Sequence, residues 1–119
     1  MQALLVIAHG SRRVASNQEI LDLVEILAAK TTHYITIQAA FLELANPSIS
    51  EGIDFCVKKG ATEVIVLPYF LSAGRHVSED IDNALAPKRE EYPQLTITIK
   101  PHIGAANGMA EMLLNLAKG

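Results

Sequence analysis

The sequence predicts one α/β domain, a three-layer sandwich in which a four-stranded parallel sheet carries helices on both faces. Two observations support this fold. Segments with strand character alternate four times with segments of helical periodicity, and two of the four strand segments are continuous apolar runs. No linker, low-complexity stretch or internal repeat interrupts the chain, so residues 1–119 are expected to form a single domain.

The four expected strands differ in their apolar pattern, and this difference predicts their order. The first, at 3–8, and the third, at 63–67, are apolar runs of the kind found in strands buried on both faces. The second, at 35–41, and the fourth, at 95–100, alternate between apolar and polar residues, as edge strands do. We therefore expect the first and third strands at the centre of the sheet, in the spatial order 2-1-3-4.

The first two helices are expected from their capping residues and apolar spacing. Ser16, with Glu19 three residues later, fits a capping box at the start of the first helix. Asn46 as the cap and Pro47 at the first helical position favour the start of the second helix. Cys56 lies on the apolar face of that helix and is expected to be a core thiol. The apolar stripe of the first helix consists of Ile20, Leu23, Val24 and Leu27.

The last two helices are expected at about 75–86 and 107–117. The third should end ahead of Pro87, because proline lacks a backbone N–H and its ring clashes with the preceding helical turn. One helix after each strand is the arrangement that covers both faces of a parallel sheet.

The composition excludes several classes of function. The net charge is −3, and the aromatic residues are three Phe and three Tyr with no Trp, so nucleic acid is not an expected partner. No apolar run approaches the roughly 18 residues that span a bilayer, and MQALLVIAHG lacks the basic region and cleavage site of a signal peptide. The single cysteine, Cys56, excludes an internal disulfide and a thiolate metal cluster. A cytoplasmic protein is therefore expected.

Two histidines are expected at the functional crevice. In a sheet of this order, ligands bind at the carboxyl ends of the strands where the winding direction reverses, here between the first and third strands. His9 directly follows the first strand, and His76 lies in the first turn of the helix after the third. Neutral imidazole binds Fe, Co, Ni or Zn. A lone histidine there would be read as an ordinary loop residue, but two converging histidines favour a metal site.

For other polar residues near these strand ends, the sequence leaves more than one role open. Glu43, just after the second strand, completes a metal shell, accepts a proton, or is a solvated residue near a helix start. Asp80, one turn beyond His76, either orients that imidazole or simply favours the helix N-terminus. His102 ends the fourth strand, one strand further from the crevice, and ranks below His9. His33 precedes the second strand on the opposite rim and is expected to be an ordinary surface residue.

Basic and apolar residues around the two histidines suit a flat substrate that is rich in carboxylates. Arginines bind carboxylates, and an apolar rim can pack against a flat ring. The alternatives are a solvated basic loop and, for Tyr69, a continuation of the core. The candidate substrate-binding residues are Ser11, Arg12, Arg75, Phe70 and Leu71, with Arg13 as a further basic neighbour.

Three segments together resemble the small CbiX-type chelatases, which insert cobalt, nickel or iron into sirohydrochlorin. They are AHGSR at 8–12, AFLELANPSI at 40–49 and LPYFLSAGRHVSEDI at 67–81. The resemblance implies a class II chelatase fold, metal held by His9 and His76, and a contribution from Glu43. It also implies a homodimer, with the tetrapyrrole bound at or near the cleft between subunits. The last third, including His102, matches less distinctively and takes no family role.

The expected function is therefore an enzyme of the lyase class that inserts Co²⁺, Fe²⁺ or Ni²⁺ into a sirohydrochlorin-type tetrapyrrole. The divalent metal is a substrate, and no organic cofactor is expected. The AHGSR turn lacks the glycine-rich loop and lysine of a P-loop, so no ATP requirement is expected either. The main alternative is a metal carrier that binds but does not catalyse. A phosphohydrolase using His9 is disfavoured, because Ala8 stands where histidine phosphatases have an arginine.

Overall fold

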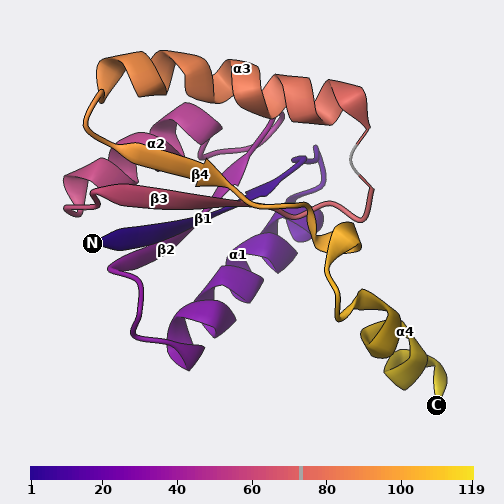
Figure 1. Cartoon of the computed structure of the whole chain (residues 1–119). Coiled ribbons are helices and arrows are strands. Elements are labelled where there is room, and N and C mark those ends of the chain that lie inside the picture. Colours follow the sequence, from indigo (N-terminus) through magenta and orange to yellow (C-terminus); the bar gives the residue numbers. More distant parts are fainter. Residues whose placement is uncertain (73) are drawn as a thin grey trace.

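The computed structural model describes residues 1–72 and 74–119 and confirms the three-layer α/β fold (Figure 1). Every strand pairs parallel to its neighbours, and the spatial order is β2-β1-β3-β4, as the apolar runs predict. Ala73, within the third segment of the resemblance, lies outside the described residues. The strands are β1 (Gln2–Ala8), β2 (Thr36–Phe41), β3 (Glu63–Pro68) and β4 (Thr96–Ile99).

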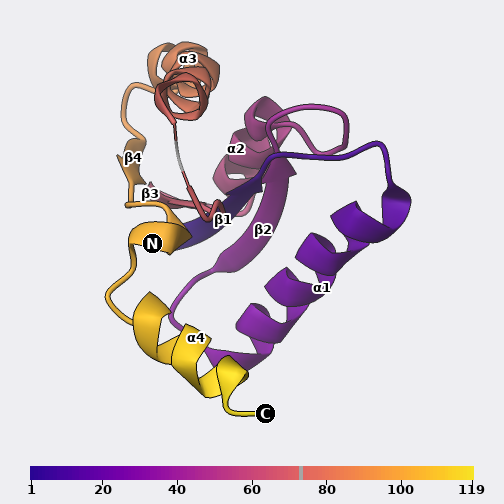
Figure 2. The same ribbon diagram turned by 90° about the vertical axis from the view of Figure 1, so that its right-hand side faces the viewer.

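Helices lie on both sides of the sheet. Two views show α2 and α3 on one side, and α1 and α4 on the other, with α4 splayed away from the body of the domain (Figures 1 and 2). Among these elements, no helix in the described chain combines the length and apolar character needed to cross a membrane. The helices are α1 (Val14–Lys30), α2 (Ile49–Lys58), α3 (Arg75–Glu91) and α4 (Met109–Ala117), with a short 3₁₀ helix, η1 (Ile103–Ala105), before α4.

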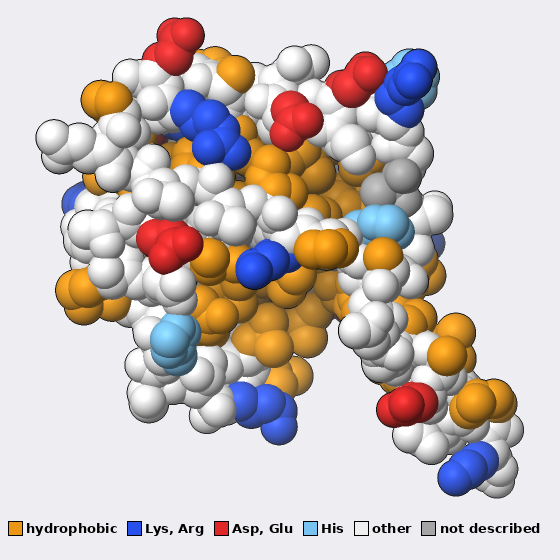
Figure 3. Space-filling view, viewed as in Figure 1, with side chains coloured by type: hydrophobic (Ala, Val, Ile, Leu, Met, Phe, Trp, Pro, Cys, Tyr) orange, Lys and Arg blue, Asp and Glu red, His pale blue; other side chains and the backbone are white. Residues whose placement is uncertain are grey.

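The hydrophobic core has two unequal parts. On the α2–α3 side, Leu5, Ile7, Val64 and Val66 are completely covered, and Cys56 of α2 joins them as the predicted core thiol. Burial raises the pKa of Cys56 to about 11, so it is an unreactive thiol. On the α1 side, the core consists of Leu4, Val6, Val24, Ile37 and Ala39, with Ile65 and Leu67 of β3 only half-buried. Figure 3 shows hydrophobic side chains open to the surface below β4, in the recess between the α1 side of the domain and α4.

The prediction that Ser16 caps the first helix is wrong, because α1 begins at Val14 with Arg13 as its N-cap. The backbone N–H of Ser16 donates to the Arg13 carbonyl at 3.1 Å, which places Ser16 inside the first turn. The Arg13 N–H is instead satisfied by the Ser11 hydroxyl at 3.0 Å. α1 therefore starts without a side-chain cap, and the Ser11 hydroxyl accepts from the N–H of the N-cap residue itself.

The predicted start of the second helix at Asn46 and Pro47 is also wrong. α2 begins at Ile49, and Ser48 forms the capping box with Glu51. The Pro47 carbonyl accepts a hydrogen bond from the backbone N–H of Phe41 at 2.8 Å. This bond keeps the segment beside the end of β2 instead of in the helix.

α3 does not stop ahead of Pro87 but continues to Glu91. Proline inside a helix removes one backbone hydrogen bond and costs about 3 kcal/mol, so tertiary contacts must compensate. Leu85 is completely buried, and the Lys88 ammonium donates to carboxylates of Asp54 and Glu91, each at 2.8 Å. These contacts on both sides of Pro87 hold the last turns of α3 against α2.

Candidate active site

His9 and Glu43 form an exposed polar pair at the carboxyl end of the sheet. The Nε2 atom of His9 lies 2.8 Å from the Oε1 atom of Glu43, and 55% of each side chain is exposed. An imidazole nitrogen and a carboxylate oxygen are both ligands for a borderline divalent metal. The structure therefore brings together one predicted metal ligand and the acidic residue whose role the sequence left open.

The backbone holds this pair in place. Beyond the ends of β1 and β2, the Leu42 N–H donates to the Ala8 carbonyl at 2.9 Å, and the Glu43 N–H donates to the His9 carbonyl at 3.0 Å. Gly10 has φ +95°, and a Cβ there would lie 1.7 Å from the Glu43 carbonyl oxygen. Only glycine permits this close approach. Gly10 is thus a structural requirement of the site that residue-level reasoning from the sequence did not single out.

The loop after Gly10 is fixed by Asn17 of α1. The Ser11 N–H donates to Oδ1 of Asn17 at 3.0 Å, and Nδ2 of Asn17 donates to the Ser11 carbonyl at 2.8 Å. The side chains of Arg12 and Arg13 are exposed beside this fixed backbone. These side chain-to-backbone bonds give Asn17 a positioning role in the loop.

The apolar rim lies on the other side of His9. The Tyr69 N–H donates to the Ile7 carbonyl at 2.8 Å, which brings residues 69–71 alongside the end of β1. The Phe70 ring meets the His9 imidazole edge to face, with centroids 6.3 Å apart and an interplanar angle of 85°. Phe70 also packs against the core, whereas Leu71 is 78% exposed. An apolar surface therefore borders the His9–Glu43 pair.

His76 and Arg75 lie in the first turn of α3, with both side chains exposed. Asp80, further along the helix, is exposed as well. Across residues 1–72 and 74–119, no three His, Cys, Asp or Glu side chains form an ion-binding group. The structure thus unites His9 with Glu43 but leaves His76 outside their cluster.

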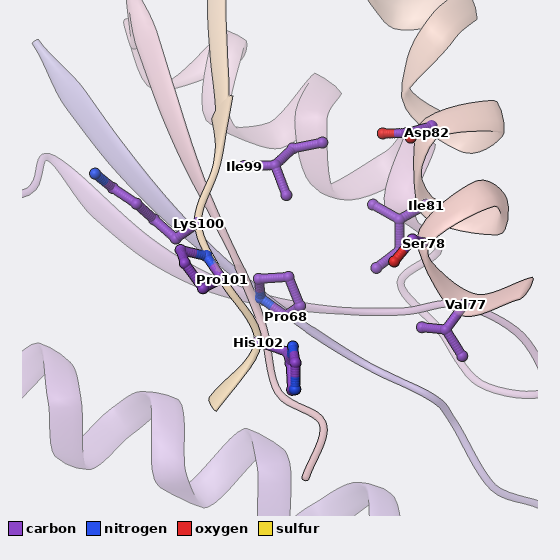
Figure 4. A pocket seen from close by; sticks show the side chains of 9 residues that line it. All are labelled: Pro68, Val77, Ser78, Ile81, Asp82, Ile99, Lys100, Pro101 and His102. Atoms are coloured by element: carbon purple, nitrogen blue, oxygen red, sulfur yellow. The ribbon is translucent and has the colours of Figure 1, made fainter. Parts of the chain in front are cut away.

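A cavity of 280 Å³ lies between α3 and the carboxyl ends of β3 and β4. Figure 4 shows Pro68, Ile81 and Ile99 lining it, with His102 next to Pro68 at its lower end. His102 is half-buried there, after β4, and β3 lies between its strand and the strand that His9 follows. His33 lies at the opposite rim, where its Nε2 is 2.7 Å from Oε1 of Gln2 in β1.

The known proteins that are similar to this chain in sequence and in structure point to one family. Sirohydrochlorin ferrochelatase from the chloroplast of Arabidopsis thaliana is 34% identical over 110 residues, which cover 92% of this chain and 48% of that protein. The cobalt complex of the sirohydrochlorin chelatase SirB from Bacillus subtilis subspecies spizizenii superimposes with a TM-score of 0.87 at 32% identity. That superposition covers 98% of this chain and 50% of the SirB chain.

A CbiX protein from Marinobacter aquaeolei has the same fold, with a TM-score of 0.86 at 24% identity over 99% of this chain and 95% of that one. The chain spans between 36% and 48% of the length of four curated relatives. The CbiX family model matches residues 3–118, almost the whole sequence. This chain belongs to the CbiX family.

Proposed function

We propose that this chain inserts a divalent metal ion into a sirohydrochlorin-type tetrapyrrole. The observation that carries the proposal is the His9–Glu43 pair, held 2.8 Å apart at the carboxyl end of the sheet and half exposed. A sequence relative carries the name sirohydrochlorin ferrochelatase, and a structure with the same fold is a sirohydrochlorin chelatase in complex with cobalt. These names support iron and cobalt as metals, and nickel is a third candidate by its chemistry with imidazole.

In the proposed site, His9 and Glu43 provide the first two ligands, and His76, which lies outside their cluster in the structure, is proposed as the third ligand in the metal-bound state. Three protein ligands leave positions open for water and then for nitrogens of the macrocycle, as a metal donor site requires. When the ion enters the macrocycle, two pyrrole N–H groups lose their protons. The site therefore needs groups that accept protons as well as groups that bind the metal. The imidazole and carboxylate become free bases when the ion leaves, and they can then accept those protons.

The residues around the pair are proposed to bind the macrocycle. Phe70 and Leu71 would pack against its flat face, because they form the apolar border next to His9. Arg12 and Arg75 would bind its carboxylates through bidentate guanidinium contacts. Ser11, whose backbone is fixed by Asn17, would donate its hydroxyl to a further carboxylate.

Two copies of the chain are proposed to act together as a homodimer. Two copies would match the length of the SirB chain, half of which this chain covers. The tetrapyrrole would then lie at or near the cleft between copies, close to the carboxyl ends of both sheets. No ATP or organic cofactor enters this reaction.

The experiment that tests the proposal measures metal insertion into sirohydrochlorin by visible absorption, with Co²⁺ and Fe²⁺ in turn. Wild type should exceed the uncatalysed rate, and His9→Ala or His76→Ala should reduce the catalysed rate at least about 100-fold. His33→Ala is the matched control, because His33 is also exposed but lies at the opposite rim. Thermal melting should be nearly unchanged in all three variants. Metal binding without acceleration would identify a metal carrier instead, and a fully active His76→Ala protein would remove His76 from the site.

A further inference from the structure

The 3₁₀ helix η1 is seated tightly against the loop that follows β3. The Gly104 N–H of η1 donates to the Phe70 carbonyl at 3.0 Å. A Cβ at Gly104 would lie 1.6 Å from the Leu71 carbonyl oxygen and 2.5 Å from its carbonyl carbon. Gly104 does not have a positive φ, so the requirement for glycine is one of space and not of conformation. The two backbones can approach this closely only because residue 104 has no Cβ.

The loop at residues 69–71 is held from two sides. The Tyr69 N–H donates to the Ile7 carbonyl at 2.8 Å, which ties the start of the loop to β1. The contacts with η1 follow at Phe70 and Leu71. In the part of the chain that the structure describes, these two backbone hydrogen bonds are the ones that join the loop to other segments. The position of the Phe70 backbone therefore depends on η1 as well as on β1.

The Phe70 side chain connects this loop to the His9–Glu43 pair. Its ring meets the His9 imidazole with centroids 6.3 Å apart and an angle of 85° between the ring planes. The polar contact of the imidazole is the 2.8 Å approach of Nε2 to Glu43, and 55% of the His9 side chain is exposed. A contact through one atom leaves a ring free to tilt, whereas an edge-to-face contact favours one angle between the planes. Phe70 is therefore suited to set the tilt of the imidazole.

We propose that Gly104 is a positioning residue of the metal site. By seating η1 on Phe70 and Leu71, it keeps the Phe70 ring against His9, and that ring holds the imidazole beside Glu43. A metal ligand works only when neighbouring packing keeps it within about 0.5 Å of its productive position. The inference rests on the proposed function, in which His9 is a ligand, and it adds a segment from the last third of the chain to the site. Its first test requires neither metal nor tetrapyrrole.

The first experiment records the imidazole proton resonances of the metal-free full chain by NMR. Phe70→Leu should shift the His9 resonances, because the ring current of the aromatic neighbour is lost. Gly104→Ala should shift them in the same direction, because η1 can no longer hold Phe70 in place. Gly108→Ala is the matched control: no atom lies within 4 Å of a Cβ there, so His9 should be unchanged. His33, at the opposite rim, should keep its resonances in every variant. Wild-type His9 resonances in Gly104→Ala, or equal shifts at His33, would overturn the proposal.

Measurements on wild type decide the question even where Gly104→Ala folds poorly. The Gly104 amide proton should be protected from exchange with solvent by its bond to the Phe70 carbonyl. The ring protons of Phe70 and His9 should show a nuclear Overhauser contact, because the two rings meet edge to face. A Gly104 amide that exchanges at the rate of an unstructured peptide, or the absence of the contact between the rings, would exclude the proposed path.

The consequence for the metal is measured by titration with Co²⁺. Gly104→Ala should weaken Co²⁺ binding about 10-fold, the effect expected when a supporting neighbour of a metal ligand is disturbed, and Gly108→Ala should not. A Gly104→Ala protein with wild-type affinity for Co²⁺ would remove the positioning role. A wild type that binds no Co²⁺ would instead contradict the proposed function, and the His9 resonances would still decide whether Gly104 positions the imidazole.

Discussion

The His9–Glu43 pair and the network around Lys88 are both clusters of charged groups, yet they are built differently. Lys88, with 9% of its side chain exposed, donates to Asp54 and Glu91, and the Tyr92 hydroxyl donates to Asp54 at 2.7 Å. These hydrogen bonds raise the pKa of Lys88 and lower that of Asp54, because they favour the charged forms of both. The His9–Glu43 pair has a single contact and is more than half exposed.

The difference separates a cluster that stabilises packing from a cluster that can take a ligand. Around Lys88 the ammonium already has two carboxylate partners, and its bond to Asp54 joins α3 to α2. At His9 and Glu43, the backbone is fixed while 55% of each side chain is exposed to solvent. Changes at the first cluster should therefore alter stability, and changes at the second should alter metal chemistry.

The largest expected effect comes from the backbone beneath the pair. Gly10→Ala places a methyl group against the Glu43 carbonyl in a conformation that alanine disfavours, so it should cost about 3 kcal/mol of stability and most of the insertion activity. Gly60→Ala is the control, because Gly60 has φ +100° but no atom within 4 Å of the added Cβ. It should cost only about 1 kcal/mol and leave activity intact. Urea denaturation and insertion rates check both, and equal effects of the two changes would contradict the steric argument.

A smaller effect is expected at Glu43. Glu43→Gln keeps the shape of the side chain and removes its charge, so affinity for Co²⁺ should fall about 10-fold or more. The melting temperature should hardly move, because both members of the pair are 55% exposed. Isothermal titration with Co²⁺ measures the affinity. Glu19→Gln, an exposed change in α1, is the control. Unchanged affinity in Glu43→Gln would remove this carboxylate from the proposed metal site.

The smallest effect is expected at Asp54, and it should be on stability alone. Its pKa is lowered by hydrogen bonds from Lys88 and then Tyr92, so its stabilisation is complete above the ordinary value of 3.8 and is lost as pH falls through the lower folded-state pKa. Asp54→Asn should lower the melting temperature by roughly 3 °C at pH 7. The difference in melting temperature between this variant and wild type should disappear as the pH drops below 3.8. Thermal melts across this range check it, and a constant gap would contradict the assigned cause.

The strand order was predictable because a strand that is buried on both faces has a continuous run of apolar residues. Continuous apolar runs identified β1 and β3 as central, and the alternating segments identified the edges. The presence of His9 and Glu43 at one end of the sheet followed from that order. The 2.8 Å contact between them did not, because it depends on how closely the turn at Gly10 approaches the Glu43 backbone.

Helix ends were less predictable, because competing hydrogen bonds decide them. Asn46, Ser48 and Ser16 are all good capping residues by type, and contacts to β2 and to Ser11 select among them. Pro87 predicted a helix end that buried Lys88 and Leu85 override. The half-buried state of Ile65 and Leu67 on the α1 side of β3 was also missed, since an apolar run does not reveal how fully each face is covered.

The central place of β1 has a consequence during synthesis on the ribosome. Every residue from Ala3 to Ala8 is buried, and Gln2 pairs in register with Glu63, 61 positions later. At about 5–20 residues per second, this apolar segment emerges roughly 3–12 s before its second neighbouring strand is made. During that interval the apolar segment lacks its β3 partner, which makes the unpaired β1 a natural target for chaperones that shield unfinished sheets.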